Sequence, residues 1–316
     1  MIKPTILRTA AGAPVAPSVI KAIKEAIDVN LVVTDISSMS SGFHFADQHE
    51  IVPRVDNPGY LQSIFDLCKK HSVNIFWPDL DEELLLMAEN KSEFEKMGVR
   101  LLLSDADTLR ICGDKYFTFE ALKGFGVPVP ESFITTEDAV GNLSFPMLLK
   151  PRQGRGSVGV TIINNHAELQ DAFNSIENPI IQEFLPGKEY TIDALSDMDG
   201  KFHYCSIRQR VSTDSGISVK GETVSDKKLE AFVESACNEL KLKGPSCFQC
   251  KEDPNGVFKF IEINPRIAGT SILSEKAGAH VITDSVRVAM GDEPKGNANF
   301  KAGFKMTRYW SEIFEG

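Results

Sequence analysis

Strand and helix signals alternate through the N-terminal third of the chain, and this alternation limits the fold more than any other feature of the sequence. Strands are expected at Thr5–Thr9, Asn30–Ile36, Val73–Trp77 and Arg100–Leu103, and helices near Pro17–Ile27, at Tyr60–His71 and at Glu82–Met97. Strands that are separated by helices pair in parallel, because each crossover returns the chain to the same end of the sheet. Ligands of such sheets bind at the carboxyl ends of the strands, which makes Ala10–Pro14 and Pro78–Glu83 candidate binding loops.

The pattern changes near residue 107, after which strands dominate. Helices are expected at Asp114–Phe125, His166–Ser175, Asp226–Leu240, Ser271–Ala277 and Val281–Met290, and strands at Pro146–Lys150, Val160–Ile163, Pro179–Phe184, Tyr190–Ser196, Phe202–Arg210, Cys247–Lys251 and Val257–Ile263. We therefore predict an α/β protein in three parts. These are a parallel-sheet N-terminal domain at residues 1–107, a small lid at residues 108–184, and an antiparallel-sheet C-terminal domain of α+β type at residues 185–316.

Composition argues against several classes of protein. The 316 residues carry a formal net charge of −10 without a cluster of Lys and Arg, which argues against a nucleic-acid partner. The sequence has neither a signal-peptide pattern nor an apolar run of about 18 residues, so we expect a cytoplasmic protein with no membrane partner. The six cysteines are dispersed, and Cys247-Phe-Gln-Cys250 lacks a second ligand pair for zinc, so we expect reduced, structural thiols.

A glycine-rich segment, Gly154-Arg-Gly-Ser-Val-Gly159, matches G-x-G-x-x-G. The dinucleotide-binding form of this motif precedes a helix, whereas here the β-branched segment Val160–Ile163 follows, which indicates a hairpin between two strands. Protein-kinase motifs are absent from the sequence. Backbone N–H groups of such a hairpin can close over an anion, and Lys150, Arg152 and Arg155 supply positive charge beside it. The alternative is an ordinary solvated hairpin.

The segment Phe260-Ile-Glu-Ile-Asn-Pro-Arg266 carries two oxygen-bearing side chains on an apolar strand. Alternate residues of a strand share a face, so Glu262 and Asn264 point the same way. Glu252–Gly256 is a turn signal, and the hairpin that it predicts brings Gln249 opposite Glu262. Oxygen donors of this kind suit Mg²⁺. The alternative is a half-exposed edge strand whose polar residues face water.

These features lie in four segments whose order and spacing resemble the ATP-grasp enzymes, and most closely their carbamoyl-phosphate-synthase-like branch of single-copy proteins. The segments are Gly113–Lys115, Leu149–Val160, Ile181–Asp193 and Phe260–Arg266. The likeness covers nearly the whole chain. It implies an N-terminal α/β domain, followed by a lid and a C-terminal domain that clasp ATP between them.

The resemblance also implies a role for each matching position. The nucleotide contacts would be Lys115 and Lys150 on the phosphates, Gly154, Arg155, Gly156, Ser157 and Gly159 in the flap, Gln182, Glu183, Phe184 and Leu185 in the hinge that clasps adenine, and Glu189 on the ribose hydroxyls. The metal ligands would be Gln249, Glu262 and Asn264, where the family often has Asp or Glu in place of this Gln. They would hold one or two Mg²⁺ ions, with Mn²⁺ as a substitute. Arg266 and Lys150 would be the catalytic cations.

The implied reaction joins a small carboxylate to an amine. The carboxylate would attack the γ-phosphoryl group of ATP to give an acylphosphate, and the amine would then displace phosphate. The segment that holds Arg208, Arg210, Ser212 and Gly216 would border the substrate, although a salt-bridged strand explains the two arginines equally well. Ala268–Ser271 could cradle the carboxylate with backbone N–H groups.

Two other functions stay open at this point: phosphorylation of bicarbonate or carbamate in the manner of carbamoyl-phosphate synthase, and ATP binding without catalysis. Retention of Lys115, Lys150, Glu262, Asn264 and Arg266 argues against the second of these. The partners expected are small-molecule carboxylate and amine substrates, and a homodimer is compatible with the sequence.

Overall fold

The computed structural model describes residues 3–154, 156 and 158–315, and its N-terminal part is the predicted parallel sheet. The strands are β1 (Thr5–Arg8), β2 (Asn30–Asp35), β3 (Gln48–Ile51), β4 (Ile75–Trp77) and β5 (Arg100–Leu101). They lie in the order β3-β2-β1-β4-β5, and every neighbouring pair is parallel. The chain leaves β1 toward β2 on one side and places β4 on the other, so the strand order reverses beside β1. This reversal is where α/β sheets bind ligands.

Helices cover both faces of this sheet. They are α1 (Ala16–Ala26), the short η1 (Ser41–Phe45), α2 (Tyr60–Lys70), α3 (Asp81–Glu89), α4 (Lys91–Lys96) and α5 (Ala106–Cys112). The single helix expected at Glu82–Met97 is two helices, because the backbone leaves helical geometry at Asn90. Neither β3 nor α5 was expected from the sequence.

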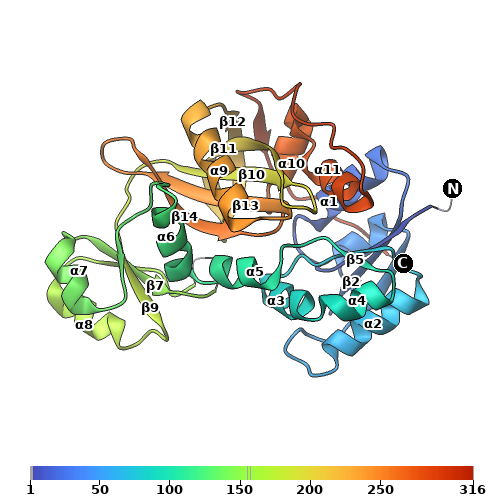
Figure 1. The fold of residues 1–316 in the computed structure, drawn as a ribbon, viewed down its shortest axis with the longest axis horizontal. Helices are drawn as coiled ribbons and strands as arrows, with labels where there is room; N and C mark the ends of the chain where they lie inside the picture. Colours follow the sequence, from blue (N-terminus) through green and yellow to red (C-terminus); the bar gives the residue numbers. More distant parts are fainter. Residues whose placement is uncertain (1–2, 155, 157, 316) are drawn as a thin grey trace.

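The lid is a four-stranded antiparallel sheet with a small core of its own. Its elements are β6 (Ser132–Phe133), α7 (Thr136–Asn142), β7 (Met147–Pro151), β8 (Thr161–Ile163), α8 (His166–Phe173) and β9 (Pro179–Glu183), with strand order β6-β9-β7-β8. The core is formed by Met147, Leu149, Ile163 and Ile181 together with helix residues such as Leu169. Figure 1 shows the lid standing apart from the N-terminal sheet.

The C-terminal domain is a six-stranded sheet in the order β14-β13-β10-β11-β12-β15, antiparallel throughout. The strands are β10 (Glu189–Ser196), β11 (Phe202–Asp214), β12 (Ile217–Val224), β13 (Gly244–Glu252), β14 (Phe258–Asn264) and β15 (Lys305–Thr307). One face is covered by α9 (Lys227–Leu240) and by α6 (Lys115–Gly124), whose Phe119 and Leu122 enter that core. The strand expected at Phe202–Arg210 continues to Asp214, and it forms a hairpin with β12, which was not expected from the sequence.

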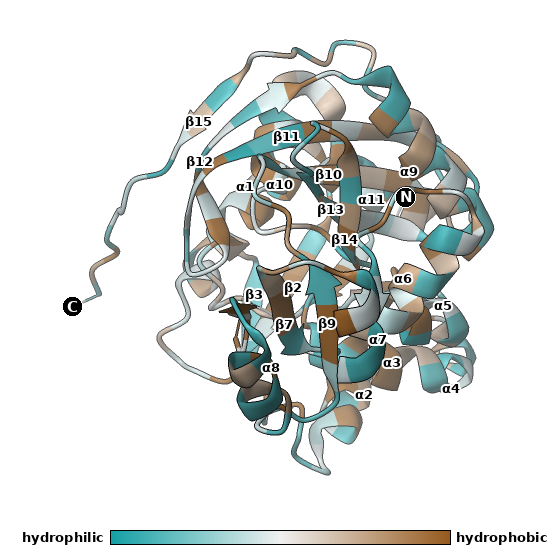
Figure 2. Ribbon diagram, turned by 90° about the vertical axis from the view of Figure 1, so that its left-hand side faces the viewer, coloured by the Kyte–Doolittle hydropathy of each residue, from teal (hydrophilic) through white to brown (hydrophobic). Residues whose placement is uncertain are grey.

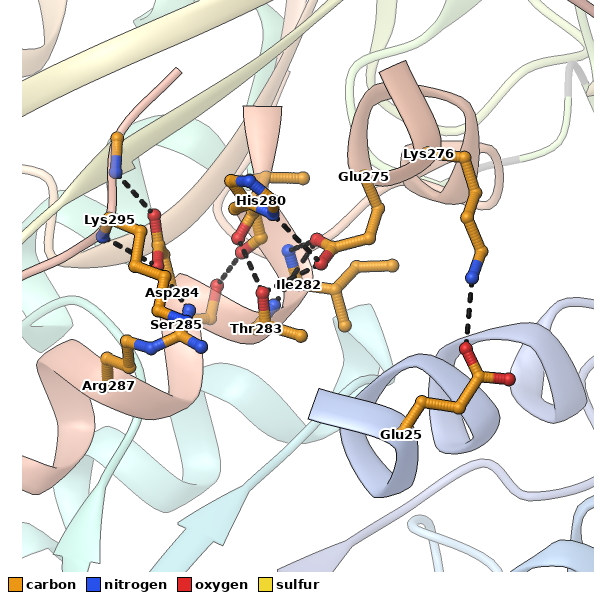
Figure 3. A network of polar contacts seen from close by, with 12 residues as sticks. Glu25, Glu275, Lys276, His280, Ile282, Thr283, Asp284, Ser285, Arg287 and Lys295 are labelled. Atoms are coloured by element: carbon orange, nitrogen blue, oxygen red, sulfur yellow. Dashed lines mark hydrogen bonds and ion pairs between the residues drawn. The ribbon is translucent and has the colours of Figure 1, made fainter. Parts of the chain in front are cut away.

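A buried polar network fixes the segment that follows β14. This segment contains α10 (Ser271–Ser274), the π-helical turn η2 (Glu275–Ala279) and α11 (Val281–Met290). The Glu275 carboxylate accepts from the backbone N–H of Ile282 and from the Thr283 hydroxyl, at 2.8 and 2.7 Å. Asp284 accepts from Arg287 at 2.6 Å (Figure 3). The Glu275 bonds tie η2 to the first turn of α11 although His280 between them is in the left-handed region at φ +57°.

The N-terminal and C-terminal domains share one hydrophobic core. Ile6, Leu31 and Val33 of the parallel sheet pack in the same buried cluster as Ile282 and Val286 of α11. Lys276 also reaches Glu25 on α1 at 3.0 Å (Figure 3). The opposite face of the parallel sheet packs against α2 to α4 in a separate cluster. No helix within the described ranges is long and apolar enough to cross a membrane.

Candidate active site

A cavity of about 440 Å³ lies where the three parts of the chain meet. The N-terminal domain contributes the ends of β1 and β4, and the lid contributes Gly156 and Val158. The C-terminal domain contributes the β11–β12 turn, the inner residues of β13 and β14, and the loop Arg266–Thr270. Both loops that the sequence indicated after β1 and β4 therefore reach this cavity. In the view of Figure 2, the lid strands β7 and β9 lie below the C-terminal strands β10 and β13.

Polar side chains cross the cavity face of the C-terminal sheet in register. Thr191 on β10 is paired with Gln249 on β13, and Gln249 is paired with Glu262 on β14. The hairpin predicted from the turn at Glu252–Gly256 thus places Gln249 opposite Glu262. Two residues further along β14, Asn264 also lines the cavity. Alternate residues such as Phe248 enter the helix-covered core instead.

This donor set fits one hard cation. Gln249, Glu262 and Asn264 supply two amide oxygens and one carboxylate to the same cavity. Mg²⁺ commonly takes one or two carboxylates and completes its shell with water and substrate phosphates. Within the described ranges, no group of three or more His, Cys, Asp or Glu is placed to hold a metal alone. A cation at this position would therefore depend on phosphate oxygens from a bound substrate.

Arg266 lines the cavity while a carboxylate of the N-terminal domain holds it. Its Nε and Nη2 donate to the two oxygens of Asp81, each at 2.7 Å, and Nη1 donates to the Ile267 carbonyl at 3.0 Å. Burial alone would lower the pKa of Arg266, but the charges of Asp81 and Asp79 raise it above its ordinary value. The guanidinium is thus permanently charged and fixed in direction. The sequence predicted its position but gave no sign of Asp81 as its partner.

Three further oxygens in the cavity wall were missed by the sequence reasoning. Asp79 pairs with Arg8 through one carboxylate oxygen, and its other oxygen is buried with no partner among the residues the structure describes. The hydroxyls of Thr191 and Ser218 are likewise buried and unpaired within that set. Burial raises the pKa of Asp79, against the opposing effect of Arg8. Of these three residues, only Asp79 has a sequence signal that could have indicated it, because it follows the end of a predicted strand.

Two lysines approach the base of the glycine hairpin. Lys150 is the penultimate residue of β7 and has 6% of its surface exposed. Burial lowers the pKa of its ammonium to about 8, although Glu262 acts in the opposite direction. Lys115 donates from Nζ to the Gly154 carbonyl at 2.9 Å. Its charge lowers the pKa of Lys150 further. Two neighbouring cations, one of them desolvated, form a site that an anion would stabilise.

The glycine hairpin closes against the β11–β12 turn. Gly154, Gly156 and Gly159 have φ of +106°, +67° and +73°, a region that L side chains rarely adopt. A Cβ added to Gly216, itself at φ +77°, would lie 3.4 Å from the Cα of Gly156. The predicted flap therefore meets the turn at a contact of two glycines. Arg155 and Ser157, also predicted for the flap, lie outside the described residues.

The hinge residues do not line the 440 Å³ cavity and are held by local contacts. The Gln182 amide donates to Ser132 at 2.7 Å, and its carbonyl oxygen is buried without a partner within the described ranges. Glu183 accepts from Lys259 at 2.7 Å. Phe184 is half-buried and Leu185 is buried where the chain passes from β9 to β10. Their predicted contacts with adenine remain a proposal.

The two candidate substrate arginines occupy different environments. Arg208 is buried, and its Nε and Nη2 donate to Asp193 at 2.7 and 2.8 Å, while Nη1 donates to the Thr270 hydroxyl. Arg210 lines the cavity, with Nε 3.0 Å from the Glu189 carboxylate and Nη2 donating to the Gly216 carbonyl at 2.8 Å. The Glu189 carboxylate, predicted for ribose, is therefore engaged with Arg210.

Two of the residues expected to contact the substrate, Arg208 and Ser212, lie outside the lining of this cavity. Arg208 does not reach the cavity wall, because Asp193 and α10 enclose it; it supports Thr270, which does line the cavity. Ser212 is also absent from the described lining, since the register of β11 shifts at that residue. In the loop Ala268–Ser271, the Ala268 N–H donates to the Ser271 hydroxyl at 2.9 Å, so this amide is not open to a carboxylate.

Comparison with protein families gives two matches that together span most of the chain. Residues 6–102 match the "PylC-like, N-terminal domain", and residues 112–270 match the "ATP-grasp domain". The chain belongs to the ATP-grasp family. The predicted fold, with its parallel N-terminal sheet and antiparallel clasping sheets, is confirmed, and so is the prediction of an ATP-grasp ligase.

Characterised ATP-grasp relatives differ in substrate. The chain is 30% identical over 225 residues to the D-alanine–D-alanine ligase of Thermotoga petrophila, covering 61% of this chain and 71% of the relative. It is 25% identical over 241 residues to the biotin carboxylase of Pseudomonas aeruginosa, covering 66% of this chain and 53% of the relative. Sequence similarity therefore identifies the family but does not identify the substrate of this chain.

Solved structures share the fold over almost the whole chain. The biotin carboxylase domain of 2-oxoglutarate carboxylase from Hydrogenobacter thermophilus, a dimer with MgADP and bicarbonate, superposes with a TM-score of 0.80 at 19% identity, covering 96% of this chain and 74% of that one. N5-carboxyaminoimidazole synthetase of Staphylococcus aureus, complexed with ADP, gives 0.76 at 17% identity, covering 93% and 80%. Both similarities concern the fold.

Proposed function

We propose that this ATP-grasp protein joins a small carboxylic acid to an amine, with ATP as the phosphoryl donor. The carboxylate oxygen forms a bond to the γ-phosphorus, the bond to ADP breaks, and the resulting acylphosphate loses phosphate when the amine attacks its carbonyl carbon. The observation that carries the proposal is the convergence of Glu262, Asn264, Gln249 and Arg266 on one cavity closed by the glycine hairpin. Phosphoryl transfer needs positioning and charge neutralisation, and these residues supply both.

Each cationic group has a separate task in this proposal. Lys150 and Lys115, beside the hairpin base, attract the phosphates of ATP. Arg266, aimed by Asp81, neutralises charge that develops on the transferred group. Glu262, Asn264 and Gln249 would hold Mg²⁺, which supplies a Lewis acid to the phosphates when bound. Closure of Gly156 against Gly216 would exclude water that hydrolyses acylphosphates.

The cavity offers no activated thiol for a covalent enzyme intermediate. Cys247 lines it, but burial raises the pKa of this thiol to about 12, with Asp193 adding to the effect. A neutral, enclosed thiol is a poor nucleophile. This supports direct attack by the substrate carboxylate.

Hydroxylamine trapping tests the proposal. The protein is incubated with ATP, MgCl₂, hydroxylamine and a panel of amino acids and small carboxylic acids, and both ADP and acyl hydroxamate are measured. We expect one acid class to give ADP and hydroxamate in equal amounts. Release of ADP that no carboxylate stimulates, or stimulated release with no hydroxamate from any acid, would contradict the acylphosphate route.

Three finer statements belong to the same proposal. We expect Mn²⁺ to replace Mg²⁺ in this assay, because the oxygen donors suit both ions. A homodimer is checked by light scattering. A cytoplasmic location is checked by fractionation of the source cells.

A further inference from the structure

A second cavity, of about 650 Å³, opens at the carboxyl ends of the parallel strands. Thr9 and Ala10 after β1, residues 34–36 at the end of β2, and residues 52–56 after β3 form one side. Tyr60 on α2 and Leu86 on α3 form the other. Its volume lies within the range of cavities that bind small metabolites, roughly 300–1,000 Å³.

The second cavity adjoins the active site. Ala10, Ala13 and Leu80 line both cavities, so these three residues form a common wall. The same loop continues from Leu80 to Asp81, which holds Arg266, and begins with Asp79 in the active site. A molecule that fills the second cavity as far as this wall would present one end to the reacting carboxylate.

The lining of the second cavity selects the chemistry of its occupant. Ile36, Val52, Val55 and Leu86 supply apolar surface. Thr34 is fully buried, and its hydroxyl has no hydrogen-bond partner among the described residues, so a ligand atom can satisfy it.

Carboxylates dominate the charge of this lining. Asp35 and Asp56 line the cavity, and Arg54 is the cation among its described lining residues. Arg54 lies 3.5 Å from Asp56 on the exposed rim, so these two charges offset each other. The Asp35 carboxylate is fixed by the N–H groups of Gly12 and Ile36, at 2.6 and 2.9 Å. Such a surface favours a cation and disfavours phosphates or a second carboxylate.

We propose that this second cavity binds the amine substrate: a primary amine of amino-acid size, carried as a cation, with an apolar body. The proposal rests on the ligase function above and adds where the acceptor binds. The apolar body lies against Val52 and Val55, the Thr34 hydroxyl bonds a polar group of the ligand, and the Asp35 carboxylate attracts the ammonium. The common wall at Ala10 and Leu80 then places the nitrogen next to the site of acyl transfer, where the ammonium loses a proton to water before the neutral amine attacks the acyl carbon.

Three six-carbon probes separate charge from apolar contact: hexylamine, hexanoate and hexanol. Their dissociation constants are measured by calorimetry on the full chain without ATP. We expect hexylamine to bind at least tenfold more tightly than hexanoate or hexanol. V55W fills the cavity from a loop and should weaken the binding of hexylamine at least tenfold. T34V is a nearly isosteric change that removes the unpaired hydroxyl, and its effect is measured on the binding of an amino-acid amide such as leucinamide. V257W, an equally large change at an exposed valine outside both cavities, is the control.

Activity distinguishes failure of this inference from failure of the ligase function. Hydroxylamine is too small to fill the second cavity, so V55W should raise the KM for the larger amine at least tenfold more than it raises the KM for hydroxylamine. Normal hydroxamate formation with equal hexylamine affinity in V55W and wild type overturns the amine cavity and leaves the ligase standing. Absence of hydroxamate in the wild type itself overturns the ligase function and, with it, the assignment of this cavity to an acceptor. Tighter binding of hexanoate than of hexylamine overturns the charge argument.

Discussion

Lys150 is buried at the base of the glycine hairpin at a cost to the stability of the fold, and removing its charge should stabilise the protein. Burial lowers the pKa of this ammonium from 10.5 to about 8, net of the attraction of Glu262. At 1.36 kcal/mol for each pKa unit, this corresponds to roughly 3 kcal/mol against folding at pH 7, where the lysine is charged in both states. Lys150→Met keeps the apolar chain and removes the charge. It should therefore raise the free energy of unfolding by up to about 3 kcal/mol.

The pH dependence has a definite sign. Because the folded-state pKa of Lys150 lies below its unfolded value, the wild type should gain stability as the pH rises from about 8 to 10.5. The increase in the free energy of unfolding caused by Lys150→Met should become smaller over the same pH range, since the wild-type lysine is then neutral in the folded state. ATP affinity of the wild type should fall as the pH rises through about 8, and phosphate binding would move this midpoint upward.

Urea titration at pH 7 and at pH 10.5, on the wild type and the variant, measures both effects. Lys69→Met, at an exposed lysine on α2, is the matched control and should change stability little at either pH. Equal or lower stability of Lys150→Met at pH 7 would refute the reasoning, as would a difference that does not change with pH. A stabilised variant that also loses ATP affinity would show stability exchanged for function.

Three further changes probe the active-site cavity that Glu262, Arg266 and Gly216 line. Glu262→Ala should leave the fold intact and lower Mg²⁺-dependent turnover about a hundredfold or more, measured as ADP release; near wild-type turnover would remove the metal assignment. Asp81→Asn keeps the shape but weakens the hold on Arg266, and should lower kcat about tenfold with little change in the KM for ATP, whereas an unchanged kcat would show that Arg266 needs no partner. Gly216→Val introduces a side chain at φ +77° against Gly156, so it should lower the free energy of unfolding by about 1–2 kcal/mol and also weaken ATP binding. Unchanged stability and unchanged ATP affinity in this variant would argue against closure of the flap at Gly216.

The parts of the site that lie on one strand or one hairpin were predictable from the sequence. Glu262 and Asn264 are two residues apart on β14, and the turn at Glu252–Gly256 fixed the register of Gln249. Strand alternation and turn chemistry act over a few residues, so a linear pattern contains them.

Contacts between distant segments were not predictable in the same way. Asp81 and Arg266 are 185 positions apart, and nothing local to either indicates the other. Arg208 and Arg210 look alike on their strand, and only the packing of α10 decides that the first is enclosed while the second faces the cavity. The strand β12 was missed because Gly221 and its polar neighbours resemble a loop, although pairing with β11 and β15 makes them a strand.

The core that joins the two ends of the chain has a consequence for biosynthesis. One face of the parallel sheet, with Ile6 and Leu31, is covered by α11 at Val281–Met290. On the ribosome this face therefore has only the cover of α1 until α11 has emerged, whereas the lid, with a core drawn from its own elements, can form long before. Nascent chains paused before α11 should thus expose apolar surface that recruits chaperones, while the lid is already protected from protease.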